Sequence, residues 1–168
     1  MESMVVGLIP IVLIDWRETV KYRDEFLACH ENENVTWELA NIGIHEYYER
    51  QRRDQRNQRF GFLMDGKLVG MARISSEINF EANGKIGYSI RPSERGKQYG
   101  TLLLRMIDAY CRKYGIRNVT ACVDIRNEAS IRALRAAGFI ETGRVFDWVP
   151  NPEPRKAMEM ALPHTLTP

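Results

Sequence analysis

The sequence has 168 residues, a length typical of one compact domain, and its 44% hydrophobic and 27% charged residues are ordinary for a soluble globular protein. No apolar run is long enough to span a bilayer, which excludes a membrane-spanning helix. The net charge of +2 does not by itself indicate nucleic-acid binding, but it leaves room for a local positive site that holds an anionic ligand.

The first apolar stretch, residues 5–14, has the character of a strand. It contains Gly7 and Pro10, follows Glu2 rather than a basic cluster, and lacks a small-residue cleavage site. We therefore interpret it as strand material and not as a signal peptide, and we expect a cytoplasmic location.

Residues 15–59 have a helical pattern, with helices expected over residues 19–29 and 42–56. The second helix ends in a run of five arginines: Arg50, Arg52, Arg53, Arg56 and Arg59. We interpret this run as a solvated helix face near the negative end of the helix dipole. An RNA-binding patch is the alternative, although no RNA-binding motif accompanies the run and nucleic acid is not the favoured partner.

From residue 60 onward the pattern changes to strands. Residues 60–64 and 68–74 flank Asp65-Gly66, a pair that tolerates the positive φ angles of a tight β-hairpin turn. A further strand is predicted over residues 85–90, where Arg91-Pro92 ends it because proline cannot extend a ladder.

The C-terminal third alternates between helix and strand. Apolar residues recur at helical spacing between Leu103 and Tyr114, and Gly115 suits the C-terminal cap. A strand over 118–125, a short helix over 128–137 and two strands over 139–149 and 155–162 follow. Without repeats or linkers, one domain of mixed α and β structure spanning residues 1–168 is the simplest interpretation.

Three cysteines, Cys29, Cys111 and Cys122, are widely spaced and form no CxxC pair. This spacing gives no support for a zinc site or a redox motif, so no metal is expected. In a reducing compartment we expect these cysteines to act as small buried hydrophobes.

The loop of residues 91–100 lies between a predicted strand and a predicted helix. Free backbone N–H groups and the helix dipole at such a place attract phosphates. Gly96 and Gly100 let a ligand approach the backbone closely, and Arg95 and Lys97 add positive charge. The loop matches neither GxxxxGK[ST] nor GxGxxG. A phosphate cradle and a plain strand-to-helix turn both fit these residues.

Residues 87–104 resemble the acyl-CoA binding motif of the GNAT acyltransferase superfamily, which has the form Arg/Gln-x-x-Gly-x-Gly/Ala. Arg95 and Gly100 match it, whereas Gln98 stands where the family usually has glycine. Downstream, Asn127 to Ser130 and the Gly138-Phe139 pair are similar to a second family motif. The resemblance covers roughly residues 60–162, and residues 15–59 correspond to the family's variable acceptor-binding region.

This resemblance implies an N-acetyltransferase that moves an acetyl group from acetyl-CoA to a primary amine by direct attack in a ternary complex. It implies an α/β fold with a mostly antiparallel, splayed sheet of about six to seven strands and about four helices. The residues expected to bind acetyl-CoA are Ser89, Ile90, Arg91, Arg95, Gly96, Lys97, Gln98, Tyr99, Gly100, Thr101, Asn127 and Ser130.

The resemblance also implies catalytic roles. The backbone N–H of Ile90 is the expected donor to the tetrahedral oxyanion. A general base must take the proton of the amine, and its candidates are Glu77, Glu81, Tyr88 and Asp124. Many members carry a proton-donating tyrosine seven residues after the asparagine, but here Leu134 occupies that position. Another tyrosine or water would then protonate the thiolate, or the thiolate leaves without assistance.

The sequence does not identify the amine that accepts the acetyl group. Glu31, Glu33 and Glu38 form a loosely acidic stretch that suits a cationic substrate or plain solvent. Leu134 and Gln98 also leave room for a non-catalytic CoA-binding sensor. Exposed strand edges in this fold often pair between subunits, so a homodimer is considered.

Overall fold

The computed structural model describes residues 11–15, 46, 49, 53, 57–76, 83–148 and 155–166. Its strands are β1 (Ile11–Asp15), β2 (Asn57–Met64), β3 (Lys67–Ser76), β4 (Asn83–Ile90), β5 (Arg117–Asp124), β6 (Ile140–Trp148) and β7 (Arg155–Ala161). The helices are α4 (Tyr99–Tyr114) and α5 (Glu128–Ala136), with the short 3₁₀ helices η2 (Pro92–Glu94) and η3 (Pro163–Thr165). These bounds confirm every strand and helix expected after residue 57 to within a few residues.

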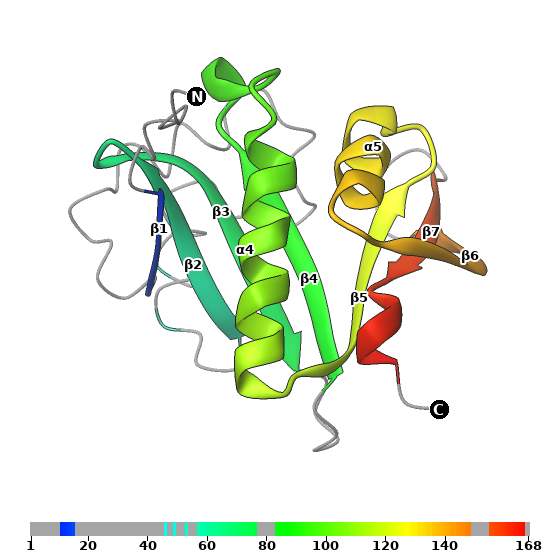
Figure 1. The fold of residues 1–168 in the computed structure, drawn as a ribbon. Coiled ribbons are helices and arrows are strands. Elements are labelled where there is room, and N and C mark those ends of the chain that lie inside the picture. The colour runs from blue at the N-terminus through cyan, green and yellow to red at the C-terminus, as the bar shows by residue number, and fades with distance from the viewer. Residues whose placement is uncertain are drawn as a thin grey trace, which may run out of the picture.

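The strands form one sheet of seven in the order β1-β2-β3-β4-β5-β7-β6. Every neighbouring pair is antiparallel except β4 and β5, which run parallel. The helices α4 and α5 cover the same face of this sheet, and the chain crosses from β4 to β5 through α4 (Figure 1). The predicted mixed, mostly antiparallel sheet is therefore confirmed.

The core lies between the sheet and these two helices. Alternate strand residues face it because successive side chains of a strand point to opposite faces. Its buried members come from β2, β3, β4, β5, α4 and α5, among them Phe60, Phe62, Ala72, Ile74, Ile86, Val119, Ala121, Leu103, Leu104, Ile107, Ile131 and Leu134. Cys111 belongs to this core, as expected, and its burial raises the pKa of its thiol to about 12.

The hairpin between β2 and β3 turns at Asp65 and Gly66, whose φ angles of 49° and 74° are those of the predicted tight turn. The expected helical tract of residues 15–59 is wrong at both ends, because Asp15 belongs to β1 and residues 57–59 begin β2. Asp15 and Phe60 are strand residues because they pair with each other across the sheet. The periodicity of a local segment carries no information about such pairing. Glu46, Glu49 and Arg53 are helical as expected, whereas residues 19–29 lie outside the described part.

The parallel strands β4 and β5 pair only at their first residues. Ile86 and Ala121 form their last residue pair, and no further pair joins the two strands within their described lengths. Beyond it, β5 continues beside β7 and β4 continues beside β3, so the strands diverge toward α5 (Figure 1). We call residues 87–90 of β4 and 122–124 of β5 the divergence. It is the splay that the sequence resemblance implied.

Candidate functional site

The backbone of β4 presents hydrogen-bonding groups to the divergence. Arg91 donates its N–H to Val69 O at 2.8 Å, which makes Ile90 and Gly70 the neighbouring pair without mutual hydrogen bonds. By this alternation the N–H groups of Tyr88 and Ile90 point away from β3 and toward β5. An extended polar chain inserted there could pair with β4 as an added strand would.

The loop after β4 ends at the N-terminus of α4, as the sequence predicted. The first-turn N–H groups of α4, on Tyr99, Gly100 and Thr101, have no acceptor within the helix. None of the backbone hydrogen bonds among the described residues uses the N–H groups of residues 96–101. Together with the positive end of the helix dipole they fit a diphosphate.

Gln98 takes the backbone conformation that glycine would take. It precedes α4 with φ 62° and ψ 13°, in the left-handed region, and Gly96 has φ 78°. The departure from the family motif at this position therefore leaves the path of the loop intact. The cost is strain, since a left-handed conformation disfavours a non-glycine residue by about 1–2 kcal/mol.

We expect Gln98→Gly to raise the melting temperature by about 1–3 °C, because released strain exceeds the added entropy of the unfolded chain by about 0.5–1 kcal/mol. Acetyl-CoA affinity should stay within about threefold, or about 0.7 kcal/mol, since the N–H group remains. Gln98→Ala is the matched control and should give no gain. Thermal denaturation and calorimetric titration measure both quantities, and equal melting temperatures for the two variants would contradict the strain.

Charged side chains hold this loop in place. Arg95 turns back and donates its Nε–H to Ile90 O at 3.0 Å, which sets its guanidinium beside the divergence. Glu94, with only 11% of its side chain exposed, accepts from Lys97 Nζ at 2.6 Å and from Lys67 Nζ at 3.2 Å. Glu94 thus ties the loop to the β2–β3 hairpin. The sequence analysis overlooked Glu94, and its spacing of three residues from Lys97 was the available signal.

Hydrogen bonds from Lys97 and Lys67 lower the pKa of the Glu94 carboxyl below its ordinary value. A carboxyl of depressed pKa stabilises the fold above its unfolded-state pKa of about 4.3 and loses that contribution as pH falls through the folded-state value. We expect wild type to melt above Glu94→Gln at pH 7 and the gap to shrink below about pH 4.3. Melting temperatures of both proteins between pH 7 and pH 3 measure this, and a gap independent of pH would contradict it.

Tyr88 connects β4 to α5. Its hydroxyl lies 2.9 Å from Ser130 Oγ, and a Cβ added to Gly100 would lie 3.3 Å from its ring. Asn127 caps α5 by accepting the N–H of Ser130 at 3.1 Å. Burial raises the pKa of the Tyr88 phenol, with partial offset from Ser130. A phenol of raised pKa stays neutral and donates a hydrogen bond, which does not suit a base.

The other expected site residues are less well placed or lie elsewhere. Asp124 accepts the N–H of Arg126 at 2.9 Å and pairs with its guanidinium at 3.1 Å, so its carboxylate is already occupied. Arg91 uses its backbone N–H on β3, and Leu134 is a core residue with 1% exposure. Glu77 and Glu81 lie outside the described residues, as do Cys29 and most of the arginine run.

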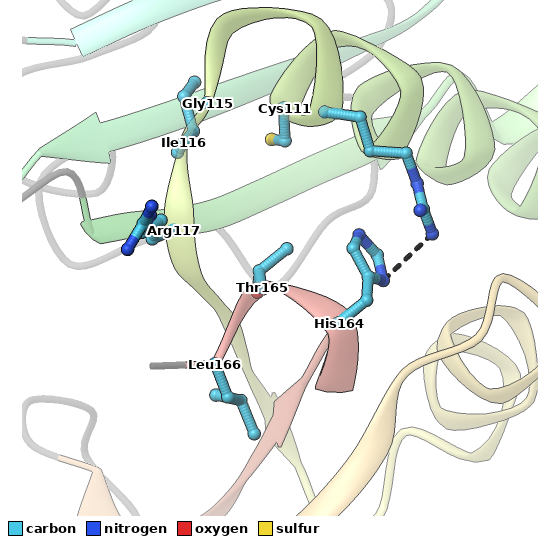
Figure 2. Close-up of a pocket in the computed structure, with 8 residues that line it drawn as sticks. Cys111, Gly115, Ile116, Arg117, His164, Thr165 and Leu166 are labelled. Carbon is cyan, nitrogen blue, oxygen red and sulfur yellow. Dashed lines mark hydrogen bonds between the residues drawn. The ribbon is translucent and has the colours of Figure 1, made fainter. Parts of the chain in front are cut away.

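A separate pocket of about 320 Å³ lies at the other end of α4 (Figure 2). His164 stands between two partners there. It accepts from Arg112 Nη2 at 3.0 Å on Nδ1, and its Nε2 lies 2.9 Å from Asp108 Oδ1. Thr165 accepts the N–H of Val119 at 2.9 Å, which fixes the C-terminal turn to β5. This pocket lies at the opposite end of α4 from the loop, and the contacts of His164 and Thr165 hold η3 against α4 and β5.

The sequence profile of the acetyltransferase (GNAT) family matches residues 16–139, most of the chain. The chain belongs to this family. It is accordingly an acetyl-CoA-dependent N-acetyltransferase, and the loop at α4 and the divergence are the places where the family resemblance put the cosubstrate. No curated protein matched the sequence.

Solved acetyltransferases share the fold at low sequence identity. A ribosomal alpha-N-protein acetyltransferase, RimL, in complex with coenzyme A superposes with a TM-score of 0.75 at 15% identity, covering 91% of this chain and 96% of that one. YncA, a putative acetyltransferase from Salmonella typhimurium with acetyl-CoA, gives 0.70 at 18%, with 91% and 92% covered. A spermidine N-acetyltransferase SpeG chimera from Vibrio cholerae and hSSAT gives 0.69 at 18%, with 90% and 94% covered.

Two further features bear on partners. Among the residues described, no three His, Cys, Asp or Glu side chains are arranged to hold a metal ion. No helix in that part of the chain is long and apolar enough to cross a membrane.

Proposed function

We propose that the enzyme transfers the acetyl group of acetyl-CoA directly to a primary amine while both substrates are bound. The observation that carries this proposal is the divergence, because the unpaired side of β4 leads straight into the phosphate-binding loop. A diphosphate at residues 96–101 would direct the pantetheine arm along Tyr88 and Ile90, toward the last strand pair at Ile86 and Ala121.

The oxyanion donor is assigned by position along β4. The thioester is at the end of the pantetheine arm. It therefore lies nearer than the diphosphate to the closed end of the divergence, where Ile86 pairs with Ala121. Of the two N–H groups that face the divergence, that of Tyr88 is nearer the closed end. We therefore assign the oxyanion to Tyr88 N–H and the pairing with a pantetheine amide to Ile90 N–H, which shifts the expected donor by two residues.

In the reaction the amine nitrogen forms a bond to the thioester carbon, the carbon–sulfur bond breaks, and the thiolate takes a proton. The neutral phenol of Tyr88 supplies that proton and recovers one through Ser130 and solvent. This role replaces the absent tyrosine at position 134. Glu77 and Glu81 stay predictions as the base that deprotonates the amine, whereas the carboxylate of Asp124 is held in its ion pair with Arg126.

The alternatives from the sequence receive less support. Membership in an enzyme family disfavours a non-catalytic sensor. Within the arginine run, Arg59 lies in β2, and Arg53 lies 4.0 Å from Glu49 on the same helical face, as expected for a solvated helix surface. The cytoplasmic location and the homodimer stay predictions. The terminal strand β6, with Val145 57% exposed, is the edge we propose for pairing between copies.

Calorimetric titration with acetyl-CoA, followed by assay of CoA thiol release with a panel of amines, tests the proposal. We expect micromolar binding and release of thiol that depends on both substrates. Failure to bind acetyl-CoA or CoA would overturn it. Binding with thiol release only by water, whatever amine is present, would overturn the transfer step.

A further inference from the structure

The sheet face opposite α4 and α5 carries basic side chains on four strands. We call Arg59, Arg73, Lys85 and Arg144 the basic row. Arg59 and Arg73 are directly opposite each other on β2 and β3, and Arg73 is opposite Gly87 on β4. Their chain neighbours Phe60, Ala72 and Ile86 face the core, so Arg59, Arg73 and Lys85 face the other way. The row therefore crosses the sheet beside the divergence.

Arg73 lies against β4 where β4 leaves β5. A Cβ built on Gly87 would lie 3.4 Å from Arg73 Nε and 3.5 Å from Arg73 Nη2, so the guanidinium rests over the glycine backbone. Gly87 is the first residue of β4 beyond the last pair with β5. The Arg73 side chain forms no hydrogen bond or ion pair with the residues that the structure describes. An exposed guanidinium is thus available at the closed end of the divergence.

In the described part of the structure, the charged side chains around Arg73 and Lys85 are mostly positive. Across the divergence, Cys122 is the first residue of β5 beyond the last pair, and Lys85 is close enough to its thiol to hydrogen-bond with it. The nearby carboxylate, Glu159, is opposite Cys122 and is already bonded to Thr142 at 3.1 Å and to Arg144 at 3.4 Å. Arg73, whose side chain has no acidic partner among the described residues, therefore favours an anion beside it.

In this proposal the amine approaches the thioester from this face. The other face of the sheet is covered by the core, α4 and α5, and the contact between Tyr88 of β4 and Ser130 of α5 lies on that side. A cationic polyamine approaching the basic row would be repelled. A neutral amine benefits there, because neighbouring positive charge lowers the pKa of an ammonium and favours the nucleophilic form.

We propose that the acceptor is a primary amine that carries a carboxylate or phosphate on the same molecule, held by Arg73 with Lys85. This inference rests on the proposed acetyl transfer and names its substrate class. Arginine suits the role because its planar guanidinium binds carboxylate and phosphate groups in a bidentate manner. The anion anchors the acceptor over β4, and the amine then reaches the thioester beyond Gly87.

Matched pairs of amines test the substrate class. We would compare an amino acid with its amide, O-phosphoethanolamine with ethanolamine, and all four with spermidine. Wild type should acetylate at least one anionic member with kcat/KM about 10- to 100-fold above its uncharged partner, the range of one charge-assisted anchor. The two pairs also distinguish carboxylate from phosphate as the anchored group.

Variants connect that preference to the basic row. Arg73→Gln should raise KM for the anionic amine about 10-fold or more and change kcat and the acetyl-CoA affinity little. Arg117→Gln, an exposed arginine at the start of β5, is the matched control and should behave as wild type. Calorimetric titration of the same amines into CoA-saturated protein gives a second readout, in which binding of the anionic amine depends on Arg73.

The outcomes separate this inference from the proposed function. Failure of wild type to bind acetyl-CoA overturns the acetyl transfer itself. If the protein binds acetyl-CoA, three results would overturn only the inference of an anionic acceptor. These are a preference for spermidine or an uncharged amine, an unchanged KM in Arg73→Gln, and no binding of any anionic amine to the CoA-saturated protein.

Discussion

Replacing Gly100 with tryptophan is expected to abolish acetyl-CoA binding, with a loss of at least about 100-fold, or about 2.8 kcal/mol. A Cβ at this position already lies 3.3 Å from the Tyr88 ring and 3.7 Å from Ala133 Cβ and Ile90 Cγ1. An indole must therefore enter the space between β4 and α5 or displace the first turn of α4. Either change disturbs the N–H groups that we assign to the diphosphate. Calorimetric titration with acetyl-CoA measures the loss.

Gly100→Ala is the matched control for this experiment. One methyl group requires a shift of only a few tenths of an ångström from the Tyr88 ring, so binding should stay within about tenfold, or 1.4 kcal/mol. Circular dichroism and thermal denaturation establish that both variants are folded. A folded tryptophan variant that binds acetyl-CoA as tightly as wild type would place the cosubstrate elsewhere on the molecule.

The second large effect concerns the phenol of Tyr88. Tyr88→Phe should lower kcat about 100-fold, the contribution typical of a positioned proton donor, and leave acetyl-CoA affinity nearly unchanged. The backbone N–H that we assign to the oxyanion is retained in this variant. The lost hydrogen bond to Ser130 should cost only about 1 kcal/mol of stability. Steady-state kinetics and calorimetric titration together separate kcat from binding.

Tyr114→Phe provides the control, because Tyr114 is 58% exposed at the far end of α4. It should retain the kinetics of wild type. Ser130→Ala keeps the phenol but removes its partner, and an intermediate decrease in kcat would support a proton path through Ser130. If Tyr88→Phe turns over at the wild-type rate, the thiolate leaves without help from this side chain.

The positions of the loop after β4 and of the helix that follows it were well predicted because their signals are local. Proline after a strand, glycines at 96 and 100 and an amphipathic helix from Leu103 follow from the chemistry of short segments. Gln98 shows the limit of such reasoning. A motif with the wrong residue leaves the backbone angle undetermined, and only the structure shows that glutamine takes φ 62° there. Packing of α4 against the sheet supplies the energy that offsets the strain.

The catalytic groups were predicted less well, because their roles depend on neighbours that are distant in sequence. Tyr88 was a base candidate by its strand position, whereas its burial and its contact with Ser130, 42 residues away, are the reasons we propose it as the proton donor. Asp124 was another candidate, and the structure shows its carboxylate paired with Arg126. Arg73 belongs to no sequence motif, and its proposed role follows only from its position opposite Gly87 in the strand register.

By itself the sequence determined the kinds of element, their order after residue 57, the hairpin at Asp65-Gly66 and the family. These depend on periodicity, turn chemistry and spacing, which act over a few residues. Only the tertiary structure decided where β4 leaves β5, which N–H groups that divergence exposes and which charges meet on the opposite face. Strand pairing joins residues far apart in the chain, and the register that sets each side chain's face is fixed by the whole sheet.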